Sequence, residues 1–258
     1  MMKVATWNVN SLKVRLPHLQ QWLEANPVDI LALQETKSPD ADFPAAALEA
    51  LGYRAVYSGQ KTYNGVAILS RHAIDAPLMN LPHFEDPQRR LLAATIAGVR
   101  VVDVYIPNGQ TVDSDKYVYK LAWIGALRAY LEGELQAHPR LLLLGDFNVA
   151  PEDRDVHDPK SWEGSVLVSP RERAAVAAIQ AMGLRDLFRK FEQPAGIFSW
   201  WDYRQGAYRR NNGLRIDLIL GSEAMHRTCV SCSVDREPRT WERPSDHAPC
   251  IATFDISA

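Results

Sequence analysis

A run of four leucines followed by a polar turn constrains this chain more than any other stretch. Leu141–Leu144 are apolar without alternation, and Gly145-Asp146-Phe147-Asn148 follow directly. Such a run bounded by glycine predicts a short strand buried on both faces. Asp146 and Asn148 then leave its end together, because side chains two apart on extended backbone point the same way. α/β folds commonly bind ligands there, although Gly-Asp-x-Asn is also ordinary turn chemistry.

Other predicted strands end in polar side chains in the same way. Residues 3–7, 28–33 and 99–105 have strand patterns, and polar residues stand at or directly after their ends. A carboxylate also lies inside the apolar stretch 214–220, where a buried charge needs a partner. An Asp-His step precedes the last predicted strand, 250–254. Taken one at a time these are ordinary exposed residues, but together they form a candidate set: Asn8, Glu35, Tyr105, Asp146, Asn148, Asp217, Asp246 and His247.

Few helices separate these strands. Helical spacing or composition predicts helices over 12–23, with Ser11 as the N-cap, and over 40–51, 114–135 and 171–182. Further strands are predicted at 53–57, 66–69 and 91–96, the last paired with 99–105 through a turn at Gly98. Short strands with few helices between them indicate two packed sheets with helices outside, rather than one doubly wound sheet. No linker divides the chain, so we expect a single domain, 1–258.

Composition narrows the class of protein. The 258 residues are 47% hydrophobic and 23% charged, which is typical of a globular chain. No apolar run approaches the roughly 20 residues of a membrane span, and a strand pattern begins at Lys3, so we expect neither membrane contact nor a signal peptide. Cys229, Cys232 and Cys250 are interpreted as reduced thiols of a cytoplasmic protein. A net charge of −2 means that any nucleic-acid contact needs a local basic surface or a metal.

The candidate set suits metal-assisted attack on phosphate. Oxygen-rich ligand sets favour Mg²⁺ or Mn²⁺ over zinc. An imidazole can orient or activate water, and amides can donate to developing negative charge. No serine or cysteine nucleophile motif and no glycine-rich phosphate loop competes with this chemistry.

Three further stretches remain open from the residues alone. Arg89 and Arg90 either bind phosphate or are merely solvated. The aromatic segment 198–204 and the arginines Arg209 and Arg210 suit nucleic-acid stacking, but a packed hairpin explains them equally well. Residues 150–170 contain Asp153, Asp155, His157 and Asp158, which we interpret as a solvated loop rather than a metal site.

Five motifs in order give a resemblance that covers nearly the whole chain. They are Trp-Asn-Val-Asn-Ser (7–11), Leu-Gln-Glu-Thr-Lys (33–37), Gly-Asp-Phe-Asn (145–148), Gly-Leu-Arg-Ile-Asp (213–217) and Pro-Ser-Asp-His-Ala-Pro (244–249). The chain thereby resembles exonuclease III and the abasic-site endonucleases of the endonuclease/exonuclease/phosphatase superfamily. The resemblance implies a DNase I-like, four-layer α/β sandwich and Mg²⁺-dependent phosphodiester hydrolysis on double-stranded DNA, with Mn²⁺ as a substitute.

The resemblance also implies residue roles. Glu35 with Asn8 is expected to form the metal site, with Asp146, Asn148, Asp246 and His247 as further ligands. Asp146 prepares the attacking water or protonates the leaving group, and Asn148 stabilises the charged phosphate. Asp246 is expected to orient His247, which contacts the scissile phosphate or activates water. Asp217 pairs with this cluster, and Tyr105 hydrogen-bonds the phosphate. Next to Asp246, the His247 imidazole should have a raised pKa.

The expected DNA contacts are Arg90, Trp200, Leu214, Arg209 and Glu163. Trp200 matches the family's aromatic in the damaged-nucleotide pocket, and Leu214 lines the facing wall. We expect a monomer that cleaves 5′ to abasic sites, processes 3′ ends and degrades duplex DNA 3′→5′. The alternative is a 3′-end specialist with little abasic activity, in which the loop 162–164, with Glu163, sets the balance. A lipid or small-molecule phosphatase and a non-catalytic DNA-binding module fit the motifs less well.

Overall fold

Two six-stranded sheets pack face to face in the computed structural model, which describes residues 1–256. The strand orders are β11-β12-β1-β2-β4-β3 and β5-β6-β7-β8-β10-β9. Each sheet contains one parallel pair, β1–β2 and β7–β8, among antiparallel neighbours, so both are mixed. The strands are β1 (Met2–Asn8), β2 (Ile30–Gln34), β3 (Arg54–Ser58), β4 (Val66–Ser70), β5 (Asp75–Met79), β6 (Leu91–Ile96), β7 (Val99–Tyr105), β8 (Leu141–Asp146), β9 (Arg185–Asp186), β10 (Asp217–Gly221), β11 (Cys229–Val234) and β12 (Cys250–Phe254).

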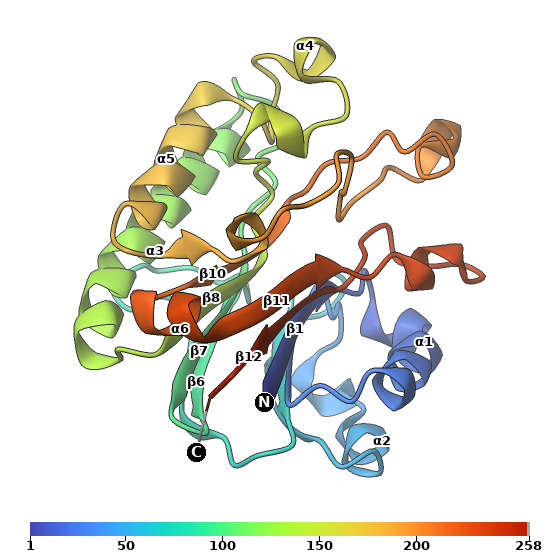
Figure 1. The fold of residues 1–258 in the computed structure, drawn as a ribbon, viewed down its shortest axis with the longest axis vertical. Coiled ribbons are helices and arrows are strands. Elements are labelled where there is room, and N and C mark those ends of the chain that lie inside the picture. The colour runs from blue at the N-terminus through green and yellow to red at the C-terminus, as the bar shows by residue number, and fades with distance from the viewer. Residues whose placement is uncertain (257–258) are drawn as a thin grey trace.

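Helices cover the two outer faces, which makes four layers. In Figure 1, α1 and α2 lie on one side of the paired sheets, and α3 and α5 lie on the other. The predicted four-layer α/β sandwich is therefore confirmed. None of the helices in residues 1–256 is both long enough and apolar enough to cross a membrane. The helices are α1 (Leu12–Ala25), α2 (Ala45–Glu49), α3 (Asp115–Ala137), α4 (Pro159–Trp162), α5 (Pro170–Gln180) and α6 (Glu223–Thr228), with short 3₁₀ turns at Asp40–Asp42, Asp153–Asp155, Phe188–Lys190, Arg204–Gly206 and Glu237–Thr240.

The four-leucine run contributes to two hydrophobic cores, as its lack of alternation predicted. Leu141 and Leu143 pack outward against α3 and α5, and Leu142 and Leu144 pack inward between the sheets. All four are fully buried. β2 behaves similarly, because alternate residues face the α1 side and the space between the sheets.

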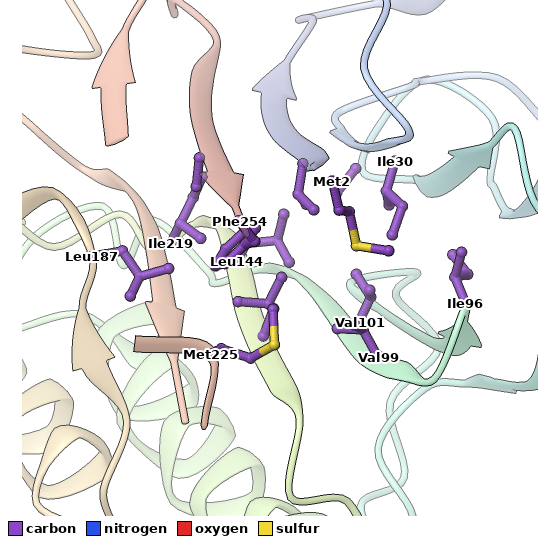
Figure 2. Close-up of a cluster of buried hydrophobic side chains, with 14 of the residues drawn as sticks. Met2, Ile30, Ile96, Val99, Val101, Leu144, Leu187, Ile219, Met225 and Phe254 are labelled. Carbon is purple, nitrogen blue, oxygen red and sulfur yellow. The ribbon is translucent and has the colours of Figure 1, made fainter. Parts of the chain in front are cut away.

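The space between the sheets is apolar at one end and polar at the other. Figure 2 shows the apolar end, where Met2, Ile30, Val101 and Leu144 from different strands meet in one cluster. Continuing along the same faces, at steps of two residues, each strand becomes polar: Thr6 and Asn8 on β1, Gln34 on β2, Asp103 and Tyr105 on β7, Asp146 on β8 and Asp217 on β10.

Two crossovers bring these polar ends together. The connections β1–α1–β2 and β7–α3–β8 each join parallel neighbours, so the carboxyl ends of four strands lie at one edge of the paired sheets. Ligands of α/β proteins bind at such edges.

Several local predictions were wrong. The Ser11 side chain makes no capping bond, and its φ of 86° lies outside the usual cap conformation. Residues 40–51 form a 3₁₀ turn and the short α2 rather than one helix. The stretch 150–170 is not simply a solvated loop, because Asp155 is fully buried and paired with Arg215. The three cysteines are free and buried, as expected.

Candidate active site

A carboxylate pair from the two sheets forms the centre of the site. The Asn8 side-chain amide donates to Glu35 Oε1 and to Asp146 Oδ2, each at 2.9 Å. The Tyr105 hydroxyl donates to the same Glu35 oxygen, also at 2.9 Å. One sheet supplies Asn8 and Glu35, and the other supplies Tyr105 and Asp146. The sequence-predicted convergence of these four residues is therefore seen in the structure.

The turn after β8 places Asn148 against Asp146. Gly145 has φ +141°, and a Cβ there would lie 1.9 Å from the Val104 carbonyl oxygen, so only glycine fits. The Asn148 backbone N–H donates to Asp146 Oδ1 at 2.9 Å, and its side-chain amide reaches Asp146 Oδ2 at 3.2 Å. Asn108 donates to Asn148 Oδ1 at 3.1 Å, and the Asn148 amide nitrogen donates to the Ile106 carbonyl at 3.0 Å as well as to the carboxylate. This nitrogen is a donor, so it suits a phosphate oxygen better than a metal.

His247 is oriented by Asp217, not by its neighbour Asp246. Its Nδ1 lies 2.8 Å from Asp217 Oδ2, and its Nε2 lies 3.8 Å from Asp146 Oδ2. Burial lowers the pKa of the imidazole, but the Asp217 and Asp146 carboxylates outweigh it and raise that pKa to about 10. The predicted rise is thus present, mainly from a different partner. The ion pair with His247 also explains the charge buried in the predicted stretch 214–220, where β10 begins only at Asp217 and ends at Gly221.

Asp246 faces a different set of groups. Its carboxylate accepts from Asn10 Nδ2 at 2.9 Å and from Trp200 Nε1 at 3.0 Å. Although the two residues are adjacent, their side chains therefore bond to different partners, Asp246 to Asn10 and Trp200 and His247 to Asp217. Burial raises the pKa of Asp246, but His247 and these two donors hold it below its usual value. The sequence-based expectation that Asp246 orients His247 was wrong.

Glu35 has a cationic neighbour that sequence reasoning missed. Lys37 Nζ lies 2.8 Å from Glu35 Oε2, and both residues have positive φ values of 51°. This left-handed backbone after β2 is uncommon for residues other than glycine, and it turns both side chains into the site. Burial raises the Glu35 pKa, but Lys37 and the Asn8 amide lower it by more, so the pKa lies below its usual value. The only sequence signal for this ion pair was that Glu35 and Lys37 are two residues apart.

The pKa values of Asp146 and Tyr105 are raised, whereas that of Glu35 is lowered. Burial, followed by the nearby Asp217 carboxylate, raises the pKa of Asp146 to about 7 even though His247 opposes the rise. Burial and the carboxylates of Glu35 and Asp146 raise the Tyr105 pKa well above its usual value, so the phenol keeps its proton. A carboxyl group that titrates near neutral pH suits proton transfer.

The chemistry of this cluster fits a hard divalent cation. Glu35, Asp146 and His247 offer ligand atoms that lie within 4.8 Å of one another. Glu35, Asp146 and Asp217 carry more negative charge than His247 and Lys37 balance, and carboxylate oxygens are the ligands that Mg²⁺ prefers. The Asn8 nitrogen faces the carboxylates, so its expected metal-ligand role requires the amide to turn over. Asp246 lies outside this group of three.

The residues expected to contact DNA lie in separate places around the cluster. Arg90 packs over the Tyr105 ring at 4.6 Å and donates to the Tyr105 carbonyl, beside a cavity of ≈ 820 Å³ that Lys116 also lines. Trp200 borders a second cavity, of ≈ 400 Å³, with Trp162, Arg204 and Arg210. Trp162 and Arg204 belong to the predicted loop 162–164 and segment 198–204, whereas no sequence pattern pointed to Lys116.

The other three expected contacts differ in exposure. Leu214 is fully buried, its backbone is bridged to that of Trp200, and it does not line the Trp200 cavity, so its expected place in the pocket wall is not seen. Arg209 is exposed, but Arg204 and Arg210 rather than Arg209 line the Trp200 cavity. Glu163 is exposed after α4 and lines a third cavity, of ≈ 450 Å³, with Lys160 and Arg173.

The matching family model spans residues 5–247 and describes the Endonuclease/Exonuclease/phosphatase family. The chain belongs to this family. Exodeoxyribonuclease III of Haemophilus influenzae is 35% identical, over 98% of this chain and all of the relative. The resemblance to the exonuclease III and AP endonuclease branch is therefore confirmed, and the chain is a phosphodiesterase and DNA-repair nuclease of that type.

Two solved structures of the family superpose closely. The 3′ phosphatase NExo from Neisseria, solved with a product DNA hairpin, is 48% identical with a TM-score of 0.98, over 99% of this chain and all of NExo. An AP endonuclease from Archaeoglobus fulgidus is 40% identical with a TM-score of 0.96, over 99% of this chain and all of that chain.

Proposed function

We propose that this protein is a Mg²⁺-dependent processor of DNA 3′ ends. It removes 3′ phosphates and related blocking groups and degrades duplex DNA 3′→5′, and it has little activity at internal abasic sites. The end-to-end match to the Neisseria 3′ phosphatase carries this proposal, since that protein is also known as a 3′-5′ exonuclease. The sequence favoured a general abasic endonuclease over a 3′-end specialist, and we now favour the specialist. We further propose that 1–258 acts as one monomeric domain.

Asp146 is placed to move the proton in this reaction. With its pKa raised to about 7, the carboxylate accepts a proton from the attacking water and returns it to the 3′ oxygen when the P–O bond breaks. Water supplies the new oxygen on phosphorus, and the proton ends on the released 3′ hydroxyl. Asn8 and Asn148 hold the Asp146 carboxylate from two sides during this exchange.

Three donors would stabilise the charged phosphate. The His247 imidazolium, fixed by Asp217, directs its Nε2 toward the Asp146 side of the site. The Tyr105 hydroxyl donates to Glu35, and the Asn148 amide donates to Asp146 and to the Ile106 carbonyl, so each would turn from its present acceptor to a phosphate oxygen. Preorganised donors of this kind gain strength in a buried site. A divalent cation held by Glu35 and Asp146 would neutralise phosphoryl oxygens when bound.

The proposal is tested with three labelled duplexes of one sequence. One carries a nick with a 3′ phosphate, one a recessed 3′ hydroxyl, and one an internal abasic analogue; each is incubated with enzyme and Mg²⁺ or with EDTA. We expect Mg²⁺-dependent phosphate release and 3′ trimming, with the abasic duplex left intact. Cleavage of the abasic duplex as fast as phosphate release would overturn end specialisation. Activity that persists in EDTA would overturn the metal dependence.

A second candidate is general abasic cleavage, which the likeness to the Archaeoglobus AP endonuclease favours. We propose that the loop at 162–164 sets the balance between the two. Glu163 adds a negative charge beside the cavity shared with Lys160, where it would repel a continuing DNA strand. Glu163→Gly should raise abasic cleavage relative to phosphate release, and Glu192→Gly, at another exposed glutamate, is the matched control. An unchanged ratio would show the loop hypothesis to be wrong.

A further inference from the structure

A polar layer lies between the apolar inter-sheet core and the active site. It consists of Thr6 on β1, Gln34 on β2 and Asp103 on β7, all fully buried. Gln34 Nε2 donates to Thr6 Oγ1 at 2.9 Å and, across the sheets, to Asp103 Oδ1 at 2.7 Å. Gln34 directly precedes Glu35, and Asp103 lies two residues before Tyr105 on the same face of β7.

Each member of the Gln34–Asp103 pair has a second oxygen that no donor group in residues 1–256 reaches. These atoms are Gln34 Oε1 and Asp103 Oδ2, and both are buried. Gln34 Nε2 donates to Asp103 Oδ1, so the two oxygens on the other side of the pair are both acceptors without a donor. Buried acceptors are nearly always paired, and an unpaired one costs about 1–3 kcal/mol. One hydrogen placed between the two oxygens would satisfy both.

The surroundings also disfavour a charge on Asp103. Gln34 is the one side chain that hydrogen-bonds to it, and no cation of the described residues pairs with it. Burial raises the pKa of this carboxyl well above its usual value, and the Gln34 amide opposes this only in part. An ionised Asp103 would also add negative charge beneath Glu35 and Asp146.

We propose that Asp103 is a protonated carboxylic acid whose Oδ2–H donates to Gln34 Oε1, so that acid and amide form a neutral cyclic pair across the two sheets. Asp103 is then a positioning residue. The pair fixes the end of β2 against β7, one layer below the Tyr105–Glu35 hydrogen bond, and so holds Glu35 in place without adding charge.

Infrared spectroscopy of the folded, metal-free protein tests the protonation state directly. At about pH 8, above the pKa of Asp146, the wild type should show the carbonyl stretch of a buried carboxylic acid, and Asp103→Asn should lack it. The same band should persist in Asp146→Asn, which excludes that carboxyl as its source. A wild-type spectrum without an acid band that depends on Asp103 would overturn the proposal, since the carboxyl would then be ionised.

Substitutions test the positioning role. Asparagine keeps both bonds to Gln34, because its amide nitrogen replaces the acid O–H, whereas leucine removes both. We expect Asp103→Asn to leave the Mn²⁺ dissociation constant, measured by titration calorimetry, and kcat unchanged within about twofold. Asp103→Leu should weaken Mn²⁺ binding and lower kcat by at least about fivefold, the equivalent of about 1 kcal/mol.

The Mn²⁺ result separates the two charge states. If Asp103 were ionised, its replacement by asparagine would remove a nearby negative charge and weaken Mn²⁺ binding. That result, or a leucine variant that binds Mn²⁺ and turns over like the wild type, would overturn the proposal. Spectroscopy and calorimetry need no DNA, so they give the same answer whichever DNA end the enzyme processes. Their failure is therefore distinguishable from failure of the proposed function.

Discussion

Two buried clusters of charge lie near each other in the fold and differ in their balance. Around Arg215, the guanidinium bonds to Asp155 at 2.7 Å and to Asp186 at 2.6 Å, and Arg189 also contacts Asp155. Two carboxylates there meet two guanidinium groups. At the active site, by contrast, the carboxylates outnumber the cations, and one of them, Asp146, has a pKa raised to about 7.

The difference separates charge that stabilises the fold from charge that is available for chemistry. In the Arg215 cluster each carboxylate is balanced by a bonded guanidinium group, so no excess charge is left for a ligand, and losing one member leaves an uncompensated buried charge. A cluster with excess carboxylates is held together by the surrounding protein at a cost in stability, and a cation or a proton relieves that cost. Perturbed pKa values of this kind are typical of functional sites.

The largest expected effect comes from Asp146→Asn. Loss of the proton carrier should lower kcat for 3′ phosphate release by about 10²–10⁴-fold, the usual range for general acid–base catalysis. The folded, metal-free protein should not lose stability, because the raised pKa means that the ionised carboxylate is disfavoured in the fold. Single-turnover rates and thermal midpoints in EDTA measure the two quantities.

Asp153→Asn is the matched control for this variant. Asp153 is an exposed aspartate paired with Arg173, and it lies outside the catalytic cluster. It should change neither kcat nor the midpoint noticeably. A clear loss of stability in Asp146→Asn would show that the active-site carboxylates stabilise the fold as the Arg215 cluster does, and the comparison would fail.

Arg215→Met should lower stability and leave kcat unchanged, the opposite of Asp146→Asn. It leaves Asp155 and Asp186 buried with Arg189 alone, so we expect the free energy of unfolding to fall by about 3–5 kcal/mol. The folded fraction should keep its turnover per molecule, because none of these groups touches the catalytic cluster. Urea unfolding and active-site-normalised rates measure both. Arg154→Met, which breaks an exposed pair, is the control and should stay within about 1 kcal/mol.

The pH dependence of stability in EDTA should come from His247, Asp146 and the buried Asp103, whose pKa is also raised by burial, and all three act in one direction. The imidazole has a folded pKa of about 10 against 6.5, so its contribution is complete below about pH 6.5 and is lost as pH rises toward 10. Asp146 has a folded pKa of about 7 against 3.8, so it destabilises increasingly from about pH 4 to pH 7.

Metal-free stability should therefore fall as pH rises from about 5 to about 9, by at most about 1.4 kcal/mol per pH unit for each group. Urea midpoints across that range measure the slope, and His247→Gln should flatten its upper half. A slope of the opposite sign would mean that acidic groups with lowered pKa values dominate.

The sequence predicted the layers and the membership of the site, because both depend on local patterns. The leucine run, the polar strand ends and the ordered motifs identify Glu35 and Asp146 without coordinates. The pairing within the site depends on the packing of two sheets, which no local pattern specifies. Asp217 therefore replaced Asp246 as the partner of His247, and the buried Asp155 looked like a loop residue because Arg215 is distant in sequence.

The smallest expected effect concerns Lys37, the one lysine bonded to Glu35. Lys37→Met removes a partly exposed ion pair, so metal-free stability should fall by no more than about 1 kcal/mol. The same lysine repels an incoming cation, so its loss should tighten Mn²⁺ binding by up to about fivefold, measured by titration calorimetry. Lys61→Met, at an exposed position, is the control and should leave binding unchanged. Weaker binding in Lys37→Met would mean that Lys37 acts through its 2.6 Å bond to Asn10, as a support for the site rather than as a substitute for the metal's charge.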